Sequence, residues 1–236
     1  MKKKSKKMKL WKKILIAIAT LFLVAVIGLL MLAGIVGYAG PFKGIATAKI
    51  GLTYHNRPQG EIVFYGASNF TLWFNLEKDM QPLVVQNHGF GGSADSDLIE
   101  KADELLYPYK PSITVFQSGS NDFVMGLTVE EICANKEKMY AAFREKLPDA
   151  TFVVLSMLPL PGRSEYWEQS TEVNAYLQKL CDEYENMIFL DASAVMMTES
   201  GGFRSEIFRS DGIHLNRDGQ LIWGELIRKA LLQATQ

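Results

Sequence analysis

Residues 61–73 read EIVFYGASNFTLW, an apolar run followed by Gly-Ala-Ser-Asn and then by an aromatic-rich segment. The apolar run predicts a buried strand and the segment after it predicts a helix, so Ser68 lies where the strand gives way to the helix. Serine is an ordinary N-cap residue and needs no chemistry to be there. The carboxyl end of a strand is also where α/β sheets place their sites, so Ser68 is a candidate nucleophile as well.

The rest of the chain repeats this alternation of strand and helix. Apolar, β-branched runs predict five short strands, at Ile62–Tyr65, Leu83–Gln86, Ser112–Phe116, Thr151–Leu155 and Met187–Leu190. Segments with helical spacing lie after them, at about 70–80, 96–107, 129–147, 167–184 and 217–233. Short apolar strands that alternate with helices indicate a parallel sheet covered on both faces. We therefore expect one doubly wound, three-layer α/β/α domain with a five-stranded parallel sheet over residues 61–236.

The N-terminal part of the chain has a different character. Residues 1–13 hold eight lysines and no acidic residue, and no charged residue follows from Ile14 until Lys43. That stretch is long enough to cross a hydrocarbon core of ~30 Å as a helix, and it exceeds the ~7–15 apolar residues of a secretory signal. We expect a basic cytoplasmic tail (1–13), an uncleaved transmembrane anchor (14–39), a connector (40–60) and a domain outside the cytoplasm. Secretion after signal cleavage is the alternative.

Charge and composition argue against several classes of function. Apart from the lysine-rich tail the chain is acidic, with a net charge of about −9, so it is a poor candidate for binding the phosphate backbone of nucleic acids. The three histidines, His55, His88 and His214, are scattered without a zinc pattern, so we expect no metal site. Cys133 and Cys181 fall in expected helices and are interpreted as small buried apolar residues, with a disulfide between them left open.

Four segments rich in polar residues and glycine lie at fitting places on this scaffold. Three follow the first three expected strands: GASN (66–69), NHGFGGS (87–93) and SGSND (118–122). The fourth, SDGIHL (210–215), lies in the loop that leads into the last expected helix. The carboxyl ends of parallel strands share one edge of a sheet, and a loop that feeds a helix can start at that same edge. All four segments can therefore meet there.

A serine nucleophile needs a base within hydrogen-bond reach and a third group that orients the base. His214 follows Asp211 by three residues, so one loop can present both, with the carboxylate on one ring nitrogen and Ser68 on the other. Acyl transfer also needs donors aimed at the developing oxyanion. The backbone N–H groups of Ser68 and Gly92 and the side-chain amide of Asn121 would supply them.

Each of these residues also has an ordinary structural explanation. Ser68 can be only an N-cap, the glycines only turn residues, and Asn121-Asp122 only turn chemistry. His88 is a rival base, although no carboxylate follows it at a similarly short spacing. Asp191, at the end of the fifth expected strand, is a rival orienting residue that we interpret as a structural cap. Asp122 can hold the loop around Asn121.

Taken together, the four segments resemble the ordered blocks of the SGNH, or GDSL-type, serine hydrolases. The text NHGFGGS, SGSNDF, LSMLPLP and DGIHLNRDG is similar to the branch that contains the catalytic subunits of platelet-activating-factor acetylhydrolase. The resemblance implies a flavodoxin-like fold, with Ser68 as nucleophile and Asp211 and His214 as the rest of the triad. It also implies an oxyanion hole formed by Ser68, Gly92 and Asn121, and it implies no cofactor.

The resemblance covers essentially all of residues 60–233, with one departure. The first block of the family usually reads Gly-Asp-Ser, and here Ala67 replaces the aspartate. That aspartate is not a member of the implied triad, but its loss can remove a hydrogen bond that fixes the loop. A degenerate, non-catalytic binding domain is therefore one alternative function.

The resemblance suggests short acyl esters as substrates, such as acetyl groups on carbohydrate or cell-envelope polymers. A lysophospholipase-type lipid hydrolase and an O-acyltransferase that passes the acyl group to a sugar hydroxyl are further alternatives. Apolar residues near the expected site can line an acyl pocket, and the candidates are Phe70, Phe90, Phe123 and Met157. Helical spacing makes most such residues core, so we expect only one or two of them to line it. The sequence does not predict an oligomeric state.

Overall fold

Residues 10–36, 43–56 and 59–235 are described by the computed structural model, which divides into two units, Met1–Tyr38 and Ala39–Gln236. Several parts of the expected segments lie outside the described residues: 1–9 of the tail, 37–39 of the anchor, 40–42 and 57–58 of the connector, and residue 236 of the domain. Each unit is considered by itself.

The first unit contains a single described element, the helix α1 (Leu10–Val36). Its 27 residues span about 40 Å at ~1.5 Å per residue. The stretch Trp11–Leu29 has a mean hydropathy of 2.3, and no part of it is buried against the rest of the chain. Apart from Lys12, Lys13 and Thr20 the stretch has no polar side chain, and Leu21 and Phe22 are 70% and 72% exposed. By length and composition, α1 is able to cross a membrane.

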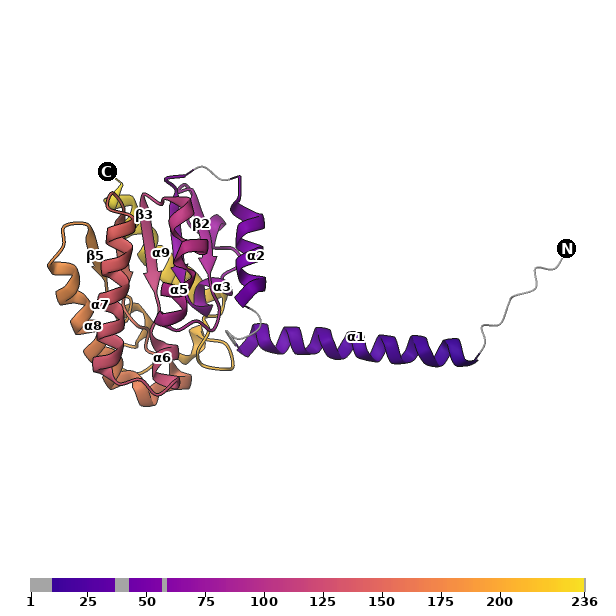
Figure 1. The fold of residues 1–236 in the computed structure, drawn as a ribbon. Coiled ribbons are helices and arrows are strands. Elements are labelled where there is room, and N and C mark those ends of the chain that lie inside the picture. The colour runs from indigo at the N-terminus through magenta and orange to yellow at the C-terminus, as the bar shows by residue number, and fades with distance from the viewer. Residues whose placement is uncertain (1–9, 37–42, 57–58, 236) are drawn as a thin grey trace. The chain divides into compact units, whose positions relative to one another are not determined.

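A five-stranded parallel sheet forms the centre of the second unit (Figure 1). Its strands are β1 (Ile62–Gly66), β2 (Val85–Gly89), β3 (Ile113–Gln117), β4 (Thr151–Leu155) and β5 (Met187–Leu190). The order across the sheet is β2-β1-β3-β4-β5, which is the flavodoxin-like order with its switch point between β1 and β3. The predicted fold class is therefore confirmed.

Helices cover both faces of this sheet, so alternate residues of a strand enter different cores. In β1, Val63 and Tyr65 face one core and Ile62 and Phe64 face the other, and every residue of the strand is buried. The first core is closed by α2 (Lys43–Tyr54), α5 (Asp95–Leu105), α7 (Val129–Lys146) and α8 (Trp167–Asp182). The second core is closed by α3 (Ser68–Thr71), α4 (Leu76–Asp79) and α9 (Arg217–Ala234). The remaining short helices are η1 (Tyr107–Tyr109), α6 (Ser120–Val124), η2 (Pro161–Tyr166), η3 (Ala194–Met196) and η4 (Ser205–Ile207).

Part of the expected connector is an element of the domain. Residues 43–54 form α2, in which Ile50 and Tyr54 lie one turn apart and are buried in the first core. The Tyr54 hydroxyl accepts a hydrogen bond from the Asn87 backbone N–H at 2.9 Å and donates one to Glu77 Oε1 at 2.7 Å. These tertiary contacts hold a helix that the weak periodicity of the sequence did not predict.

The predicted helix at about 70–80 is instead two short helices, α3 and α4. The Asn87 side-chain amide donates to the backbone carbonyls of Phe70 (2.8 Å) and Trp73 (3.2 Å), so it occupies acceptors that a continuous helix would use. The second strand also extends to Gly89, three residues beyond the prediction. A Cβ on Gly89 would lie 2.2 Å from the Thr71 backbone nitrogen, so the close packing of α3 on β2 requires glycine there.

Candidate active site

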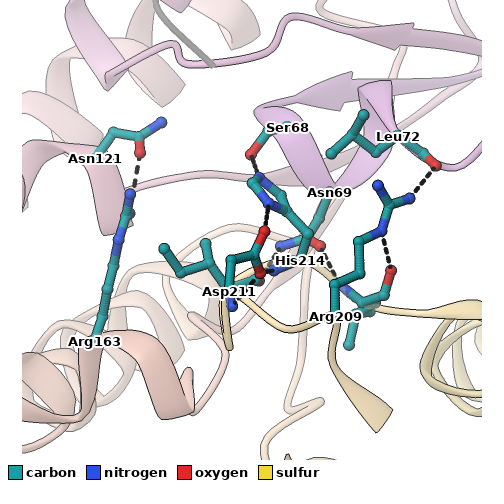
Figure 2. A network of polar contacts seen from close by, with 10 residues as sticks. Ser68, Asn69, Leu72, Asn121, Arg163, Arg209, Asp211 and His214 are labelled. Carbon is teal, nitrogen blue, oxygen red and sulfur yellow. Dashed lines mark hydrogen bonds and ion pairs between the residues drawn. The ribbon is translucent and has the colours of Figure 1, made fainter. Parts of the chain in front are cut away.

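The segments at residues 66–69, 118–122 and 210–215 meet at the carboxyl edge of the sheet (Figure 2), and Ser93 of the remaining segment is hydrogen-bonded to Asn121. Ser68 is the first residue of α3, directly beyond β1. Asn121 lies in the first turn of α6, beyond β3, where Gly119 makes the turn with φ +114°. Asp211 and His214 come from the loop that precedes α9. Chain segments about 146 residues apart are thus brought within hydrogen-bond distance.

Asp211, His214 and Ser68 form one continuous hydrogen-bonded series. His214 Nδ1 lies 2.7 Å from Asp211 Oδ2, and His214 Nε2 lies 2.9 Å from Ser68 Oγ. With Nδ1–H donating to the carboxylate, the neutral ring presents an acceptor at Nε2 to the serine hydroxyl. This arrangement can remove the proton from Ser68 when the hydroxyl attacks a carbonyl carbon.

The Asp211 carboxylate also fixes the loop that carries the histidine. Its Oδ1 accepts the backbone N–H groups of Ile213 (2.8 Å) and His214 (2.9 Å). Burial raises the pKa of Asp211, but these hydrogen bonds and the one from the His214 ring outweigh burial and lower the pKa below its ordinary value. Asp211 is therefore ionised at neutral pH and can stabilise a positive charge on the ring.

Asn69 holds the histidine loop from the side of the serine, and the sequence did not reveal this. Its Oδ1 accepts the Leu215 N–H at 3.0 Å, and its Nδ2 donates to the Ile213 carbonyl at 3.4 Å. These two residues flank His214, and Asn69 itself is 8% exposed. Its place beside Ser68 was visible, but no sequence pattern linked it to a loop 146 residues away.

The three predicted oxyanion donors come from three loops at the same edge. The Ser68 N–H is at the start of α3, where the helix itself provides no acceptor for it. Gly92 has φ +75°, a conformation that glycine adopts without strain. The Asn121 amide donates to the Ser93 carbonyl at 2.8 Å and accepts a hydrogen bond from Arg163 at 3.0 Å. One hydrogen of the Asn121 amide is thus bonded to the Ser93 carbonyl. The other hydrogen takes no part in that bond and can donate elsewhere.

A buried cluster of charged side chains supports the loop that carries Asn121. Lys136 Nζ lies 3.1 Å from Asp95 Oδ2 and also bonds to Ser118, while the Asp122 carboxylate accepts the Asp95 N–H at 3.1 Å. Lys136, Asp95 and Asp122 are at most 1% exposed. Burial and the charge of Asp95 together raise the pKa of Asp122 to about 7, although Lys136 opposes both. Asp122 thus ties the Asn121 loop to the start of α5.

The rival residues have other partners. His88 is fully buried, with Nδ1 2.5 Å from the Leu105 carbonyl, and burial lowers its pKa to about 4. Asp191 accepts the backbone N–H and the hydroxyl of Ser193, which is a local capping arrangement. Ala67, in place of the aspartate of the usual motif, is buried and donates its N–H to the Gln117 carbonyl at 3.2 Å.

Four apolar residues were expected to line an acyl pocket. Of these, Phe123 lines a pocket in the described part of the chain. It stacks on Tyr166, with ring centroids 5.4 Å apart, beside a pocket with about 230 Å³ of empty volume. The lining residues are Ser120, Phe123, Leu158, Leu160, Arg163, Tyr166, Trp167 and Ser170. Phe70 stacks on Trp223 in the second core and Phe90 lies in the first core, each 1% exposed. Met157 is buried too, against the position of Gly119.

Two further features concern cysteine and metal chemistry. Cys133 and Cys181 are both free thiols, and burial raises the pKa of Cys181 to about 12, which makes it a poor nucleophile. Within residues 10–36, 43–56 and 59–235, no group of three or more His, Cys, Asp or Glu side chains is arranged to hold a metal ion.

Comparisons with solved structures agree with the fold. A protein from Streptococcus pneumoniae provisionally named as a platelet activating factor is similar in fold, with a TM-score of 0.72 and 21% identity over 87% of this chain and 99% of that one. A carbohydrate esterase of family 3 from Talaromyces cellulolyticus gives a TM-score of 0.59 and 17% identity over 75% of this chain and 98% of that one. A GDSL-like lipase from Bacteroides thetaiotaomicron gives a TM-score of 0.64 and 17% identity over 80% of this chain and 98% of that one. These likenesses concern the fold.

A sequence comparison with curated proteins gives no match. The sequence profile of the GDSL-like Lipase/Acylhydrolase family matches residues 64–222, which include the last three residues of β1, Ser68 and the loop with Asp211 and His214. The family resemblance expected from the four segments is thereby confirmed. The chain belongs to the GDSL-like lipase/acylhydrolase family and is a serine ester hydrolase.

Proposed function

We propose that this chain is a membrane-anchored esterase that removes short acyl groups, such as acetyl, from carbohydrate or cell-envelope material. The observation that carries the catalytic part is the series of two hydrogen bonds, 2.7 Å and 2.9 Å long, from Asp211 through His214 to Ser68. The replacement of the usual aspartate by Ala67 leaves both distances in the hydrogen-bonding range, which argues against a degenerate binding domain.

The proposed reaction has two steps. Ser68 Oγ attacks the ester carbonyl while His214 Nε2 takes the hydroxyl proton, and Asp211 stabilises the imidazolium. The C–O bond to the alcohol then breaks, the alcohol leaves with the proton from His214, and the acyl group remains on Ser68. In the second step a water molecule attacks the acyl-serine while His214 takes its proton. The C–O bond to Ser68 then breaks, Ser68 Oγ takes the proton back from His214, and the acid is released. Donors from Ser68, Gly92 and Asn121 would hold the oxyanion in both steps.

The pocket beside Asn121 favours a short acyl group. Its volume of about 230 Å³ includes space that is open to solvent, so the part enclosed by protein is smaller than that. The stacked rings of Phe123 and Tyr166 limit its size and give it an apolar lining. A long lipid chain would need more apolar surface than these residues provide. The similar folds of a carbohydrate esterase and of an acetyl esterase are consistent with a small acyl group.

The helix α1 would hold the enzyme at a membrane. Its Trp11–Leu29 stretch is apolar and unburied, and the lysine-rich tail before it favours a cytoplasmic N-terminus. Because α2 belongs to the domain, only six residues separate it in the chain from α1, and they reach at most about 25 Å when extended. A substrate of the anchored enzyme would therefore lie near the membrane surface.

The test uses the full-length chain in non-ionic detergent and its Ser68→Ala variant, assayed on p-nitrophenyl esters of two to twelve carbons. We expect hydrolysis by the wild type that is greatest for the acetyl ester and is lost in the variant. A maximum at long chains would favour a lipid hydrolase over a deacetylase. Faster turnover of the acyl-enzyme with added sugar would indicate an acyltransferase. Equal, near-zero rates for two folded proteins would contradict the proposal.

A further inference from the structure

Arg163 contacts the candidate oxyanion hole from outside the triad. It lies in η2, and its Nη1 donates to Asn121 Oδ1 at 3.0 Å and to Ser120 Oγ at 2.9 Å. Figure 2 shows its side chain extending to the oxygen end of the Asn121 amide, while the nitrogen end points away from it. No sequence motif marks this residue.

The guanidinium of Arg163 is half-buried and has no close counter-ion among the described residues. Among the residues that the structure describes, no carboxylate lies within 4.0 Å of it, and the oxygens it contacts are neutral. Burial lowers its pKa, while the more distant Tyr166, Glu165 and Asp211 raise it. A buried cation is normally paired with an anion. An unpaired cation beside a hydrolytic site can stabilise the negative charge that develops there during the reaction.

The contact with Asn121 also decides which end of the amide faces the reaction. The oxygen and nitrogen ends of an amide are nearly equal in shape, so hydrogen bonds alone set their orientation. Arg163 holds Oδ1, and the Ser93 carbonyl takes one hydrogen of Nδ2 at 2.8 Å. The second Nδ2 hydrogen is the one that an oxyanion would accept. Donation from a cation to Oδ1 polarises the amide and makes this N–H a stronger donor.

The segment that carries Arg163 is fixed against the triad loop. The Gly162 N–H donates to the Gly212 carbonyl at 2.9 Å, and a Cβ on Gly162 would lie 2.2 Å from the Asp211 carbonyl oxygen. Gly162 thus permits a close approach of η2 to the residues beside Asp211. Arg163 extends from this contact to Asn121, so it links the loop of the triad to the loop of the oxyanion hole.

We propose that Arg163 is a positioning residue for the oxyanion hole, which orients and polarises the Asn121 amide. This inference rests on the proposed esterase function. It predicts an effect on kcat, because the amide is oriented for a charge that exists only in the transition state. It also predicts that the effect passes through Asn121.

The test compares full-length Arg163→Met, Arg163→Lys, Asn121→Ala and the Arg163→Met/Asn121→Ala double variant, with Arg228→Met as a control on α9. The readouts are kcat and KM on p-nitrophenyl acetate and the rate of Ser68 labelling by a fluorophosphonate. Because a lost oxyanion donor costs about 100-fold to 1,000-fold, we expect Arg163→Met to lower kcat by about 10-fold to 100-fold with KM little changed. Arg163→Lys should recover part of the loss.

The double variant distinguishes positioning from other roles. In the Asn121→Ala background, Arg163→Met should have little further effect on kcat or labelling. Three results would overturn the inference: additive effects of Arg163→Met and Asn121→Ala in the double variant, an unchanged kcat of Arg163→Met, or a rise in its KM alone. So would a defect confined to an anionic ester such as mono-p-nitrophenyl succinate, which would make Arg163 a substrate-binding residue. If the wild type neither hydrolyses nor labels, the proposed function and this inference both fail; a reactive wild type matched by Arg163→Met overturns the inference alone.

Discussion

The triad depends on one neighbouring residue, Asn69, that is not a member of it. Asn69 contacts the chain on both sides of His214, through the Leu215 N–H and the Ile213 carbonyl. Since Ser68 immediately precedes Asn69 in the chain, one short segment presents the serine and also holds the loop that brings the histidine to it. The distance of 2.9 Å between Ser68 Oγ and His214 Nε2 therefore depends on Asn69.

Asn69→Ala should lower kcat by about 10-fold to 100-fold with a smaller change in KM, because a histidine that is loosely held is a poorer base. Asn69→Asp keeps the acceptor for the Leu215 N–H but loses the donor to the Ile213 carbonyl, so its loss should be intermediate. Steady-state kinetics on p-nitrophenyl acetate gives both values, and thermal unfolding shows whether the variants fold. Wild-type kinetics in Asn69→Ala would show that the other bonds of the loop are sufficient.

Some helices and strands can be predicted from the local sequence, and others cannot. Strands such as β1 and β4 are continuous apolar runs buried on both faces, and their predicted positions match the structure. The later part of β2 was missed because it contains Asn87 and His88, polar residues whose partners lie elsewhere in the chain. The helix α2 was missed for a similar reason, since the contacts that hold it join it to β2 and α4.

Tyr54→Phe should lower the free energy of unfolding of the domain by about 1–3 kcal/mol, because it leaves the part-buried Asn87 N–H without its acceptor. Leu52→Ala, at a position on the same helix that is 75% exposed, is the matched control and should change it by less than about 0.5 kcal/mol. Urea unfolding of the full-length protein, followed by tryptophan fluorescence, measures both. Equal effects of the two substitutions would mean that α2 contributes through general packing and not through this hydrogen bond.

At the scale of the whole molecule, a buried charge cluster links the stability of the fold to pH. In the unfolded chain Asp122 loses its proton near its ordinary pKa of 3.8, whereas in the folded protein the pKa is about 7. Between these values the folded state binds more protons than the unfolded state, so the free energy of unfolding falls as pH rises. With Asp122 protonated, the cluster is a neutral pair of Lys136 and Asp95.

Asp122→Asn keeps an oxygen acceptor for the Asp95 N–H and removes the ionisation. Its free energy of unfolding should therefore fall less than that of the wild type between pH 4.5 and pH 7, with a difference of a few kcal/mol at most. Asp149→Asn, an exposed position, should run parallel to the wild type. Urea unfolding at pH 4.5, 5.5 and 7.0 provides the comparison. Parallel curves for Asp122→Asn and the wild type would show that the buried carboxyl is already ionised at pH 4.5.

The candidate site was largely predictable because its chemistry lies in short segments at the ends of strands. Ser68, Asp211 and His214 could be placed from strand ends and from the three-residue spacing of the last two. Asn69 and Arg163 could not, because they act through contacts with residues 146 and 42 positions away. Phe70 and Phe90 are buried in the two cores, which the sequence could not show, since an aromatic residue beside a site has the same sequence pattern as one that fills the core.

The proposed activity requires Ser68 to be a nucleophile that His214 activates. The most direct test treats the full-length protein and its His214→Ala variant with a fluorophosphonate, digests both, and locates the adduct by mass spectrometry. We predict a single adduct on Ser68 of the wild type, formed much more slowly in His214→Ala. No adduct on the folded wild type, an adduct on another residue, or equal labelling of the two proteins would contradict the claim.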